Sequence, residues 1–279
     1  EGLSPFECDG LSAYREKPLV VVLPESIEHI KSVIALCKQH LIPIVTRGAG
    51  TGLAAGALPL SNGLLLVVSK LKKIISINPD ARSATLQPGV RNLAISDAAK
   101  PYGLFYAPDP SSQIACSIGG NVAENSGGVH CLKYGLTVNN ILQLKILTIE
   151  GELITLGSEA LDTPGYDLLA LLTGSEGLLG VIVEVTVKLI PIPPTVQVLL
   201  AAFDDVSKAG DAVSSIIASG FLPAGLEMMD QLSIRAAEDF IHAGYPEDAK
   251  AILLCEVDGS LEECEYLSEQ IKHLLLNKG

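Results

Sequence analysis

The 279-residue sequence is long enough for two compact units and has a globular composition, with 48% hydrophobic and 18% charged residues. Its net charge of −13, from 19 Lys and Arg against 32 Asp and Glu, argues against a nucleic-acid partner. The six cysteines lack CxxC spacing and the five histidines are scattered, which predicts reduced thiols and no metal cluster. The longest apolar stretch, residues 178–192, contains Glu184, Lys188 and Pro191, so we expect no transmembrane segment.

The N-terminal part reads as a small α/β unit that ends near residue 90. A short apolar strand is expected at 19–23, followed by a helix that begins after Pro24 and Ser26 and carries apolar residues at helical spacing. The remaining strands of this unit are expected at residues 42–45, 64–68, 74–77 and 84–86.

The next hundred residues differ, because a helix at 91–99 is followed by a long stretch, 106–128, with little periodicity and many Gly, Pro, Ser and Asn residues. Further elements are expected as strands at 141–149, 152–155 and 181–190 and a helix at 167–172. Prolines at 191, 193 and 194 mark a boundary. Beyond it, strands at 196–203, 225–228 and 251–257 alternate with helices at 207–218, 231–239 and 261–276, an α+β pattern with a ferredoxin-like rhythm.

The first candidate binding loop is Arg-Gly-Ala-Gly-Thr-Gly at 47–52. Alternating glycines let successive N–H groups converge on an anion and let a phosphate approach closely. A Rossmann fingerprint, Gly50-x-Gly52-x-x-Ala55, fits the letters but not the context, because Pro59 and Gly63 interrupt the required helix and Lys72 stands where an acid is needed. Phosphate binding and a plain turn both remain open for this loop alone.

The second candidate loop, residues 108–128, holds two Gly-Gly pairs beside two asparagines. So much flexible backbone is costly to order, which favours a ligand site for a long polar molecule over a glycine-rich packing seam. A third glycine turn at 173–184 is not a serine-hydrolase elbow, because Thr173 stands at the first glycine position. For this turn, a backbone edge that faces a ligand and a simple hairpin corner both remain possible.

Taken in order, six segments carry a resemblance: 43–52, 86–90, 108–110, 119–128, 134–135 and 174–182. The chain resembles the FAD-linked oxidases of the vanillyl-alcohol-oxidase (PCMH) fold, in particular the glycolate oxidase, D-2-hydroxyacid and D-lactate dehydrogenase branch. The resemblance implies a PCMH-type FAD-binding domain at 1–192, with α/β subdomains at about 1–90 and 91–192. A partial ferredoxin-like cap domain would follow at 193–279.

The resemblance also implies that loop 47–52 wraps the FAD diphosphate, that 108–110 and 117–128 line the ribityl chain and isoalloxazine, and that 176–182 closes over adenosine. The residues expected at the cofactor are Arg47, Gly48, Ala49, Gly50, Thr51, Gly52, Leu53, Pro108, Asp109, Pro110, Cys116, Ser117, Gly119, Gly120, Asn121, Glu124, Asn125, Gly127, Gly128, Tyr134, Glu176, Gly180 and Ile182.

Non-covalent FAD is expected, because Thr51 stands where some relatives attach flavin through a histidine; Cys131 is read as a packed thiol rather than a thioether. The implied reaction is hydride transfer from a 2-hydroxy acid of glycolate or D-lactate type to the flavin. The family's substrate-binding basic residues, metal cluster and catalytic histidine fall beyond residue 279, so no catalytic residue is named and little turnover by this chain alone is expected.

Iron–sulfur and second flavoprotein-like subunits are the partners that the resemblance suggests. We expect a cytoplasmic protein, with attachment to the inner membrane through partner subunits as an open alternative. Two other functions stay open: a non-catalytic flavin-binding or assembly subunit, and an oxidase of the same fold for another substrate, such as a sugar acid or an ether-lipid precursor.

Overall fold

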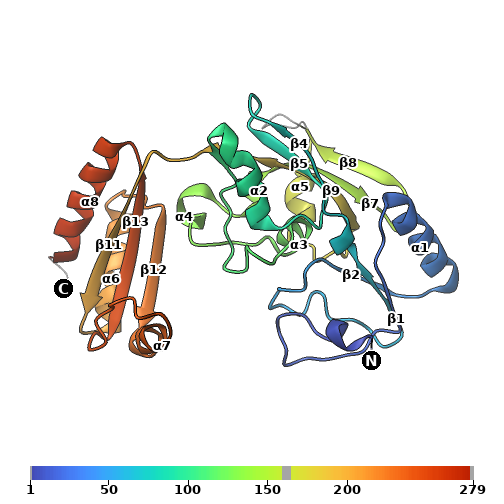
Figure 1. Ribbon diagram of the computed structural model, residues 1–279, viewed down its shortest axis with the longest axis horizontal. Coiled ribbons are helices and arrows are strands. Elements are labelled where there is room, and N and C mark those ends of the chain that lie inside the picture. Colours follow the sequence, from blue (N-terminus) through green and yellow to red (C-terminus); the bar gives the residue numbers. More distant parts are fainter. Residues whose placement is uncertain (1, 159–164, 277–279) are drawn as a thin grey trace. The chain divides into compact units, whose positions relative to one another are not determined.

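The computed structural model describes residues 2–158 and 165–276 (Figure 1). Contacts divide the chain into two compact units, each with its own core. The first consists of Glu1–Gly128 and Leu136–Ile192, and the second of Val129–Gly135 and Pro193–Gly279. A short piece from the middle of the first unit's sequence therefore belongs to the second.

The first unit opens with a three-stranded parallel sheet of order β1-β3-β2. Its strands are β1 (Val20–Val22), β2 (Ile44–Arg47) and β3 (Leu64–Val67), and helix α1 (Ile27–His40) connects β1 to β2. The side chain of Ser26 caps α1 by accepting from the His29 N–H. Ile30 and Ile34 lie one turn apart and are buried with the side chains of β3. The apolar residues at helical spacing therefore form the face of α1 that packs on the sheet.

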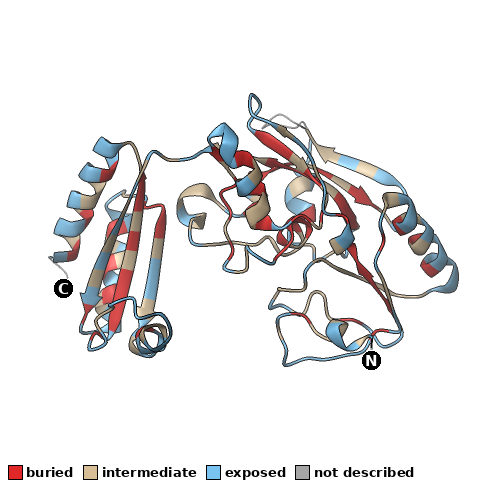
Figure 2. Cartoon of the chain, viewed as in Figure 1, coloured by how far each residue is buried: buried red, intermediate tan, exposed pale blue. Residues whose placement is uncertain are grey.

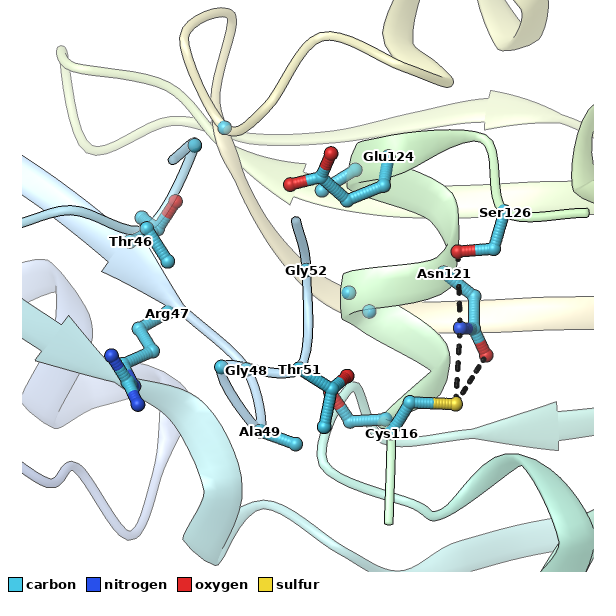
Figure 3. Close-up of a pocket in the computed structure, with 18 of the residues that line it drawn as sticks. Thr46, Arg47, Gly48, Ala49, Thr51, Gly52, Cys116, Asn121, Glu124 and Ser126 are labelled. Carbon is cyan, nitrogen blue, oxygen red and sulfur yellow. Dashed lines mark hydrogen bonds between the residues drawn. The ribbon is translucent and has the colours of Figure 1, made fainter. Parts of the chain in front are cut away.

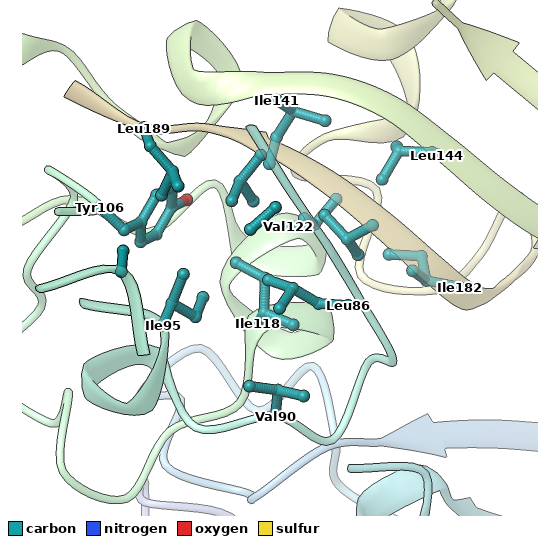
Figure 4. Packing of buried hydrophobic residues seen from close by; sticks show 14 of the residues in the cluster. Leu86, Val90, Ile95, Tyr106, Ile118, Val122, Ile141, Leu144, Ile182 and Leu189 are labelled. Carbon is teal, nitrogen blue, oxygen red and sulfur yellow. The ribbon is translucent and has the colours of Figure 1, made fainter. Parts of the chain in front are cut away.

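A five-stranded antiparallel sheet of order β4-β5-β9-β7-β8 forms the larger part of the first unit. Its strands are β4 (Ile74–Asn78), β5 (Ser83–Leu86), β7 (Ile141–Leu147), β8 (Leu153–Gly157) and β9 (Val181–Lys188). Helices α2 (Asn92–Ala99), α3 (Ile118–Glu124) and α5 (Leu168–Leu172) belong to the same part. Figure 4 shows Ile118 and Val122 of α3 packed among Leu86, Ile141 and Ile182.

The remaining short elements of the first unit are β6 (Leu104–Phe105), which pairs with β10 (Ile190–Pro191), and the 3-10 turns Ser4–Phe6, Val68–Lys70, Lys100–Tyr102 and Thr137–Asn140. Strand β4 pairs with β5 and β5 pairs with β9, so both belong to the five-stranded sheet rather than to the sheet of β1–β3. The sheets therefore divide this unit between β3 and β4, earlier in the chain than the expected division near residue 90.

The stretch 106–128, expected to be a loop throughout, contains helix α3. The only large apolar residues of α3, Ile118 and Val122, lie one helical turn apart and are fully buried. Gly119 is required between them, because a Cβ there would lie 2.6 Å from the Pro88 side chain. Tertiary packing thus overrides the low helical propensity of a segment that carries two glycines.

The second unit is an antiparallel sheet of order β11-β13-β12 with helices on both faces. Its elements are α4 (Cys131–Tyr134), β11 (Thr195–Phe203), α6 (Val206–Ala218), β12 (Gly225–Asp230), α7 (Gln231–Ile241), β13 (Ala251–Gly259) and α8 (Leu261–Leu276). Leu253 packs with α6 and α8, whereas its neighbour Ile252 packs with α7, as alternation along a strand requires. Buried residues line the sheet and the inner faces of its helices (Figure 2).

The segment Val129–Gly135 is held in the second unit by side chains of β13. Lys133 forms an ion pair with the carboxylate of Asp258, whose other oxygen accepts a 2.5 Å hydrogen bond from the Tyr134 hydroxyl. His130 Nε2 lies 2.9 Å from Glu256 Oε1. Burial and the Asp258 carboxylate raise the pKa of the Tyr134 hydroxyl. Tyr134, which was expected at the cofactor, therefore anchors this segment to β13.

Among the described residues, no helix combines the length and apolar character needed to cross a membrane.

Replacing Leu144 by alanine tests the core. Leu144 lies on β7 and is 0% exposed, so Leu144→Ala is expected to lower the free energy of unfolding by about 2–5 kcal/mol. Leu153 lies on the neighbouring strand β8 and is 46% exposed, so Leu153→Ala is the matched control, with an expected loss below about 1 kcal/mol. Urea denaturation of the two variants measures both values, and equal losses would contradict this packing.

Candidate functional site

A cavity of about 430 Å³ lies in the first unit, between the loop after β2, helix α3 and the turn before β9 (Figure 3). It is lined by Thr46, Arg47, Gly48, Ala49, Gly50, Thr51, Gly52, Leu53, Gly56, Ala57, Val68, Pro88, Pro110, Ser112, Cys116, Ser117, Gly119, Gly120, Asn121, Ala123, Glu124, Ser126, Gly127, Glu176, Gly177, Gly180, Val181 and Ile182. The cavity thus joins three glycine turns that are far apart in the sequence.

The loop that follows β2 lines this cavity and carries backbone N–H groups that the described protein does not pair. Within the described chain, the N–H groups of residues 49–53 have no hydrogen-bond partner. Residues 53–63 contain no helix, so the Rossmann context that the sequence argued against is absent from this described stretch. Backbone N–H groups that converge without partners favour an anionic group such as a phosphate.

Gly48 and Ser117 are in contact at the wall of the cavity. A Cβ on Gly48 would lie 2.3 Å from Ser117 Oγ, so a larger residue there would displace the Ser117 side chain or separate the two segments. Ser117 is the N-cap residue of α3, yet its side chain makes no capping bond. Its Oγ is buried without a hydrogen-bond partner in the described protein. A buried hydroxyl without a partner is costly, and a ligand oxygen in this position would remove the penalty.

The loop around α3 is fixed by an amide network. Asn121 Nδ2 donates to Ser126 Oγ and to Cys116 Sγ, both at 3.3 Å, and its Oδ1 accepts from Asn92 Nδ2 at 3.0 Å. Asn92 also donates to the Pro108 carbonyl at 3.0 Å. Asn92 and Asn121 are each 2% exposed, so the network is buried and holds the cavity wall in one arrangement.

Two carboxylates converge at one end of the cavity. A Cβ on Gly56 would lie 2.6 Å from Glu176 Oε2 and 2.8 Å from Glu124 Oε1. Burial raises the pKa of Glu124, and the nearby carboxylates of Glu176 and Asp9 raise it further. This end of the cavity therefore disfavours a phosphate and suits hydroxyl or amine donors.

Most of the residues expected at the cofactor surround this cavity. The exceptions are Pro108, Asp109, Asn125, Gly128 and Tyr134. Asn125 Oδ1 instead accepts from the Val138 N–H at 3.0 Å, and Asp109 lies against Gly128, whose added Cβ would be 2.4 Å from Asp109 atoms.

Four lining residues, Ala123, Ser126, Gly177 and Val181, lie within the expected segments 117–128 and 176–182 without having been named singly. Six lie outside every segment that was expected at the cofactor: Thr46, Gly56, Ala57, Val68, Pro88 and Ser112. The first four, and Thr46, adjoin expected residues in sequence and could have been included. Val68 and Pro88 reach the site only through the packing of β3 and of the turn after β5, which no local motif signals.

Comparison with known proteins assigns the family. Residues 18–157 match the FAD binding domain family, and residues 192–279 match the C-terminal domain of FAD linked oxidases. The chain belongs to the FAD-linked oxidases. FAD is the cofactor of this family, and the unpartnered donors and glycine cradle described above fit a diphosphate-bearing cofactor.

Among curated relatives, the glycolate oxidase subunit GlcD of Escherichia coli K12 is 64% identical over the whole chain, and that of Bacillus subtilis is 41% identical over 96% of it. A D-lactate dehydrogenase of Anaerostipes hadrus is 33% identical over 98% of the chain. The chain spans only 56%, 57% and 59% of these three relatives, respectively.

Solved structures support the fold. p-Cresol methylhydroxylase with bound substrate superposes with a TM-score of 0.81 at 17% identity, covering 99% of this chain and 60% of that one. Alkyldihydroxyacetonephosphate synthase gives 0.78 at 20% identity, covering 93% and 50%. Both likenesses confirm the expected PCMH-type architecture.

Replacing Glu124 by glutamine tests the electrostatics of the cavity. A raised carboxyl pKa means that the folded state holds the proton more tightly than the unfolded state. Stability from this group is present below pH 4.5 and is lost as the pH rises through the raised pKa. Without FAD, Glu124→Gln is expected to match the parent protein at low pH and to unfold at a higher temperature at neutral pH.

The measurement is the thermal midpoint as a function of pH, with Glu152→Gln, at an exposed position, as the control. A Glu124→Gln variant that loses stability at neutral pH would contradict the electrostatic account.

Proposed function

We propose that this chain carries the FAD site of an enzyme that oxidises a 2-hydroxy acid of glycolate or D-lactate type to the 2-oxo acid. The observation that carries the proposal is the pairing of the unpartnered Ser117 hydroxyl with the N–H groups of loop 49–53 around a glycine cradle. The names of the relatives supply the substrate class. We further propose that FAD is bound non-covalently.

The cavity suggests an orientation for the cofactor. The diphosphate would lie along residues 48–51 of the loop rather than at Gly52 and Gly56, which the carboxylates of Glu124 and Glu176 approach. Those carboxylates would accept hydrogen bonds from adenosine hydroxyl or amine groups. The flavin end would then reach toward Cys116 and Ser126, whose positions the Asn121 amide fixes.

In the reaction, the α-carbon of the 2-hydroxy acid loses a hydride and its hydroxyl loses a proton, which leaves the 2-oxo acid. When bound, FAD supplies the acceptor for the hydride. This chain's own residues contribute by binding and orientation: loop 49–53 and Ser117 hold the anionic middle of the cofactor, and the buried Asn92–Asn121 network keeps the wall rigid. The relatives named as subunits suggest that further subunits accept the electrons.

Replacing Gly48 by alanine tests the cradle. The added Cβ would collide with Ser117 Oγ and narrow the gap to α3, so Gly48→Ala is expected to weaken FAD binding at least about 100-fold. Gly210 lies on α6 with nothing within 4 Å of an added Cβ, so Gly210→Ala is the matched control and should bind FAD as the parent does. Flavin fluorescence titration measures both constants, and unchanged affinity of Gly48→Ala would place the diphosphate elsewhere.

The catalytic part of the proposal is tested with two proteins: the chain itself, and a chimera that continues it with the remaining sequence of the Escherichia coli relative. We expect both to bind FAD. Only the chimera should oxidise glycolate or D-lactate rapidly when an artificial electron acceptor is supplied. A fully FAD-loaded chimera that oxidises no 2-hydroxy acid would refute the proposed activity, and rapid turnover by the chain alone would refute the expectation that its substrate chemistry needs further sequence.

A further inference from the structure

An N-terminal strap, residues 6–10, lies against the loop that would hold the diphosphate. It precedes residues 18–157, which match the FAD binding domain family. Two contacts join the strap to Arg47: Arg47 Nη1 donates to the Cys8 carbonyl oxygen at 2.6 Å, and the guanidinium carbon lies 5.9 Å from the centre of the Phe6 ring. The first is a charge-assisted hydrogen bond and the second a cation–π contact.

The strap also carries a carboxylate, that of Asp9, which interacts with the charge of Arg47. Burial of the guanidinium lowers the pKa of Arg47, and the carboxylate of Asp9, a strap residue that is 7% exposed, opposes this shift. One Asp9 oxygen accepts from the Leu11 N–H at 2.9 Å, while the other has no hydrogen-bond partner in the described protein. A buried carboxylate in this state depends on a nearby cation, and Arg47 supplies it.

The guanidinium packs on the back of the loop. Gly50 has a φ of 73°, and a Cβ there would lie 2.1 Å from Arg47 Nη2. In Figure 3, Arg47 points away from Cys116 and Asn121, which line the opposite wall of the cavity. Although Arg47 is one of the residues around the cavity, its charged end is thus occupied by the strap and by Gly50.

The strap also touches the loop directly. A Cβ on Gly10 would lie 2.8 Å from the carbonyl oxygens of both Thr51 and Gly52. The strap therefore covers the carbonyl oxygens of Thr51 and Gly52, while the N–H groups of residues 49–53 have no partner in the described protein. A glycine-rich loop loses much conformational entropy when it is ordered, so a contact that orders it before the ligand arrives increases affinity.

We propose that Arg47 is a positioning residue that clamps the strap onto the back of loop 48–52, and that it does not contact the phosphates. Residues 6–10 thereby belong to the cofactor site as its outer support. This inference rests on the proposed FAD binding for its functional part, whereas the clamp itself is a property of the protein without FAD.

The test compares Arg47→Gln, Gly10→Ala and the double variant. Gly10 has no positive φ, so alanine there acts only through its contact with the loop. Each single change is expected to weaken FAD binding about tenfold, and the double variant should be no weaker than the weaker single variant, because both act through one contact. The dependence of FAD affinity on salt should stay as in the parent. Arg15→Gln is the control, because it breaks the ion pair between Arg15, whose side chain is 61% exposed, and Glu7 of the strap without removing a contact of the strap with the loop; it should leave affinity unchanged.

A direct phosphate contact by Arg47 would give a different result: Arg47→Gln would flatten the salt dependence, and the two single losses would multiply. Either outcome overturns the proposal. Should Arg47→Gln fail to fold, Gly10→Ala decides alone, because undiminished FAD affinity in that variant also refutes the clamp.

A second measurement separates the clamp from FAD binding. In the protein without FAD, backbone amide order parameters of residues 49–53 are expected to fall in Gly10→Ala and Arg47→Gln but not in Arg15→Gln. Unchanged order parameters would refute the clamp whether or not FAD binds. If the variants lose order as expected but the parent protein binds no FAD, only the proposed function is refuted.

Discussion

The close approach of two backbone segments, at Gly48 and Ser117, is the constraint on which the cavity depends. Residue 48 cannot carry a Cβ, and α3 reaches its position only because Gly119 packs directly on Pro88. β2 and β3 deliver the first segment, while Ile118 and Val122 bury the second in the core below the five-stranded sheet. The result is a wall in which the N–H groups of the loop, unpartnered in the described protein, lie beside a buried hydroxyl, and on the proposed function a phosphate would bind there.

Charged side chains are distributed unevenly around this cavity. The chain is strongly acidic, and the carboxylates of Glu124 and Glu176 meet at Gly56, with Glu124 Oε1 also close to Gly52, where a Cβ would lie 3.3 Å from it. The cation nearest the donors, Arg47, is held by the Cys8 carbonyl and the Phe6 ring. On the proposed function, a dinucleotide would be bound chiefly by backbone dipoles, which hold an anion with little reorganisation.

Local sequence signals predicted most of the elements. The cap at Ser26 and the spacing of Ile30 and Ile34 were enough for α1, and glycine spacing was enough to mark two of the loops around the cavity. The predictions that failed concern elements whose positions depend on long-range packing. Helix α3 exists because its two apolar residues are buried by distant strands, and β4 and β5 belong with β9 through pairing across about a hundred residues. The membership of Val129–Gly135 in the second unit follows from ion pairs with β13 that no local pattern announces.

The most direct measurement is a crystal structure of this chain with FAD. The account predicts diphosphate oxygens within hydrogen-bond distance of Ser117 Oγ and of the N–H groups of residues 49–53, with the adenosine directed toward Glu124 and Glu176. FAD located elsewhere, or a diphosphate held by the Arg47 guanidinium with the N–H groups of the loop left unpaired, would contradict it.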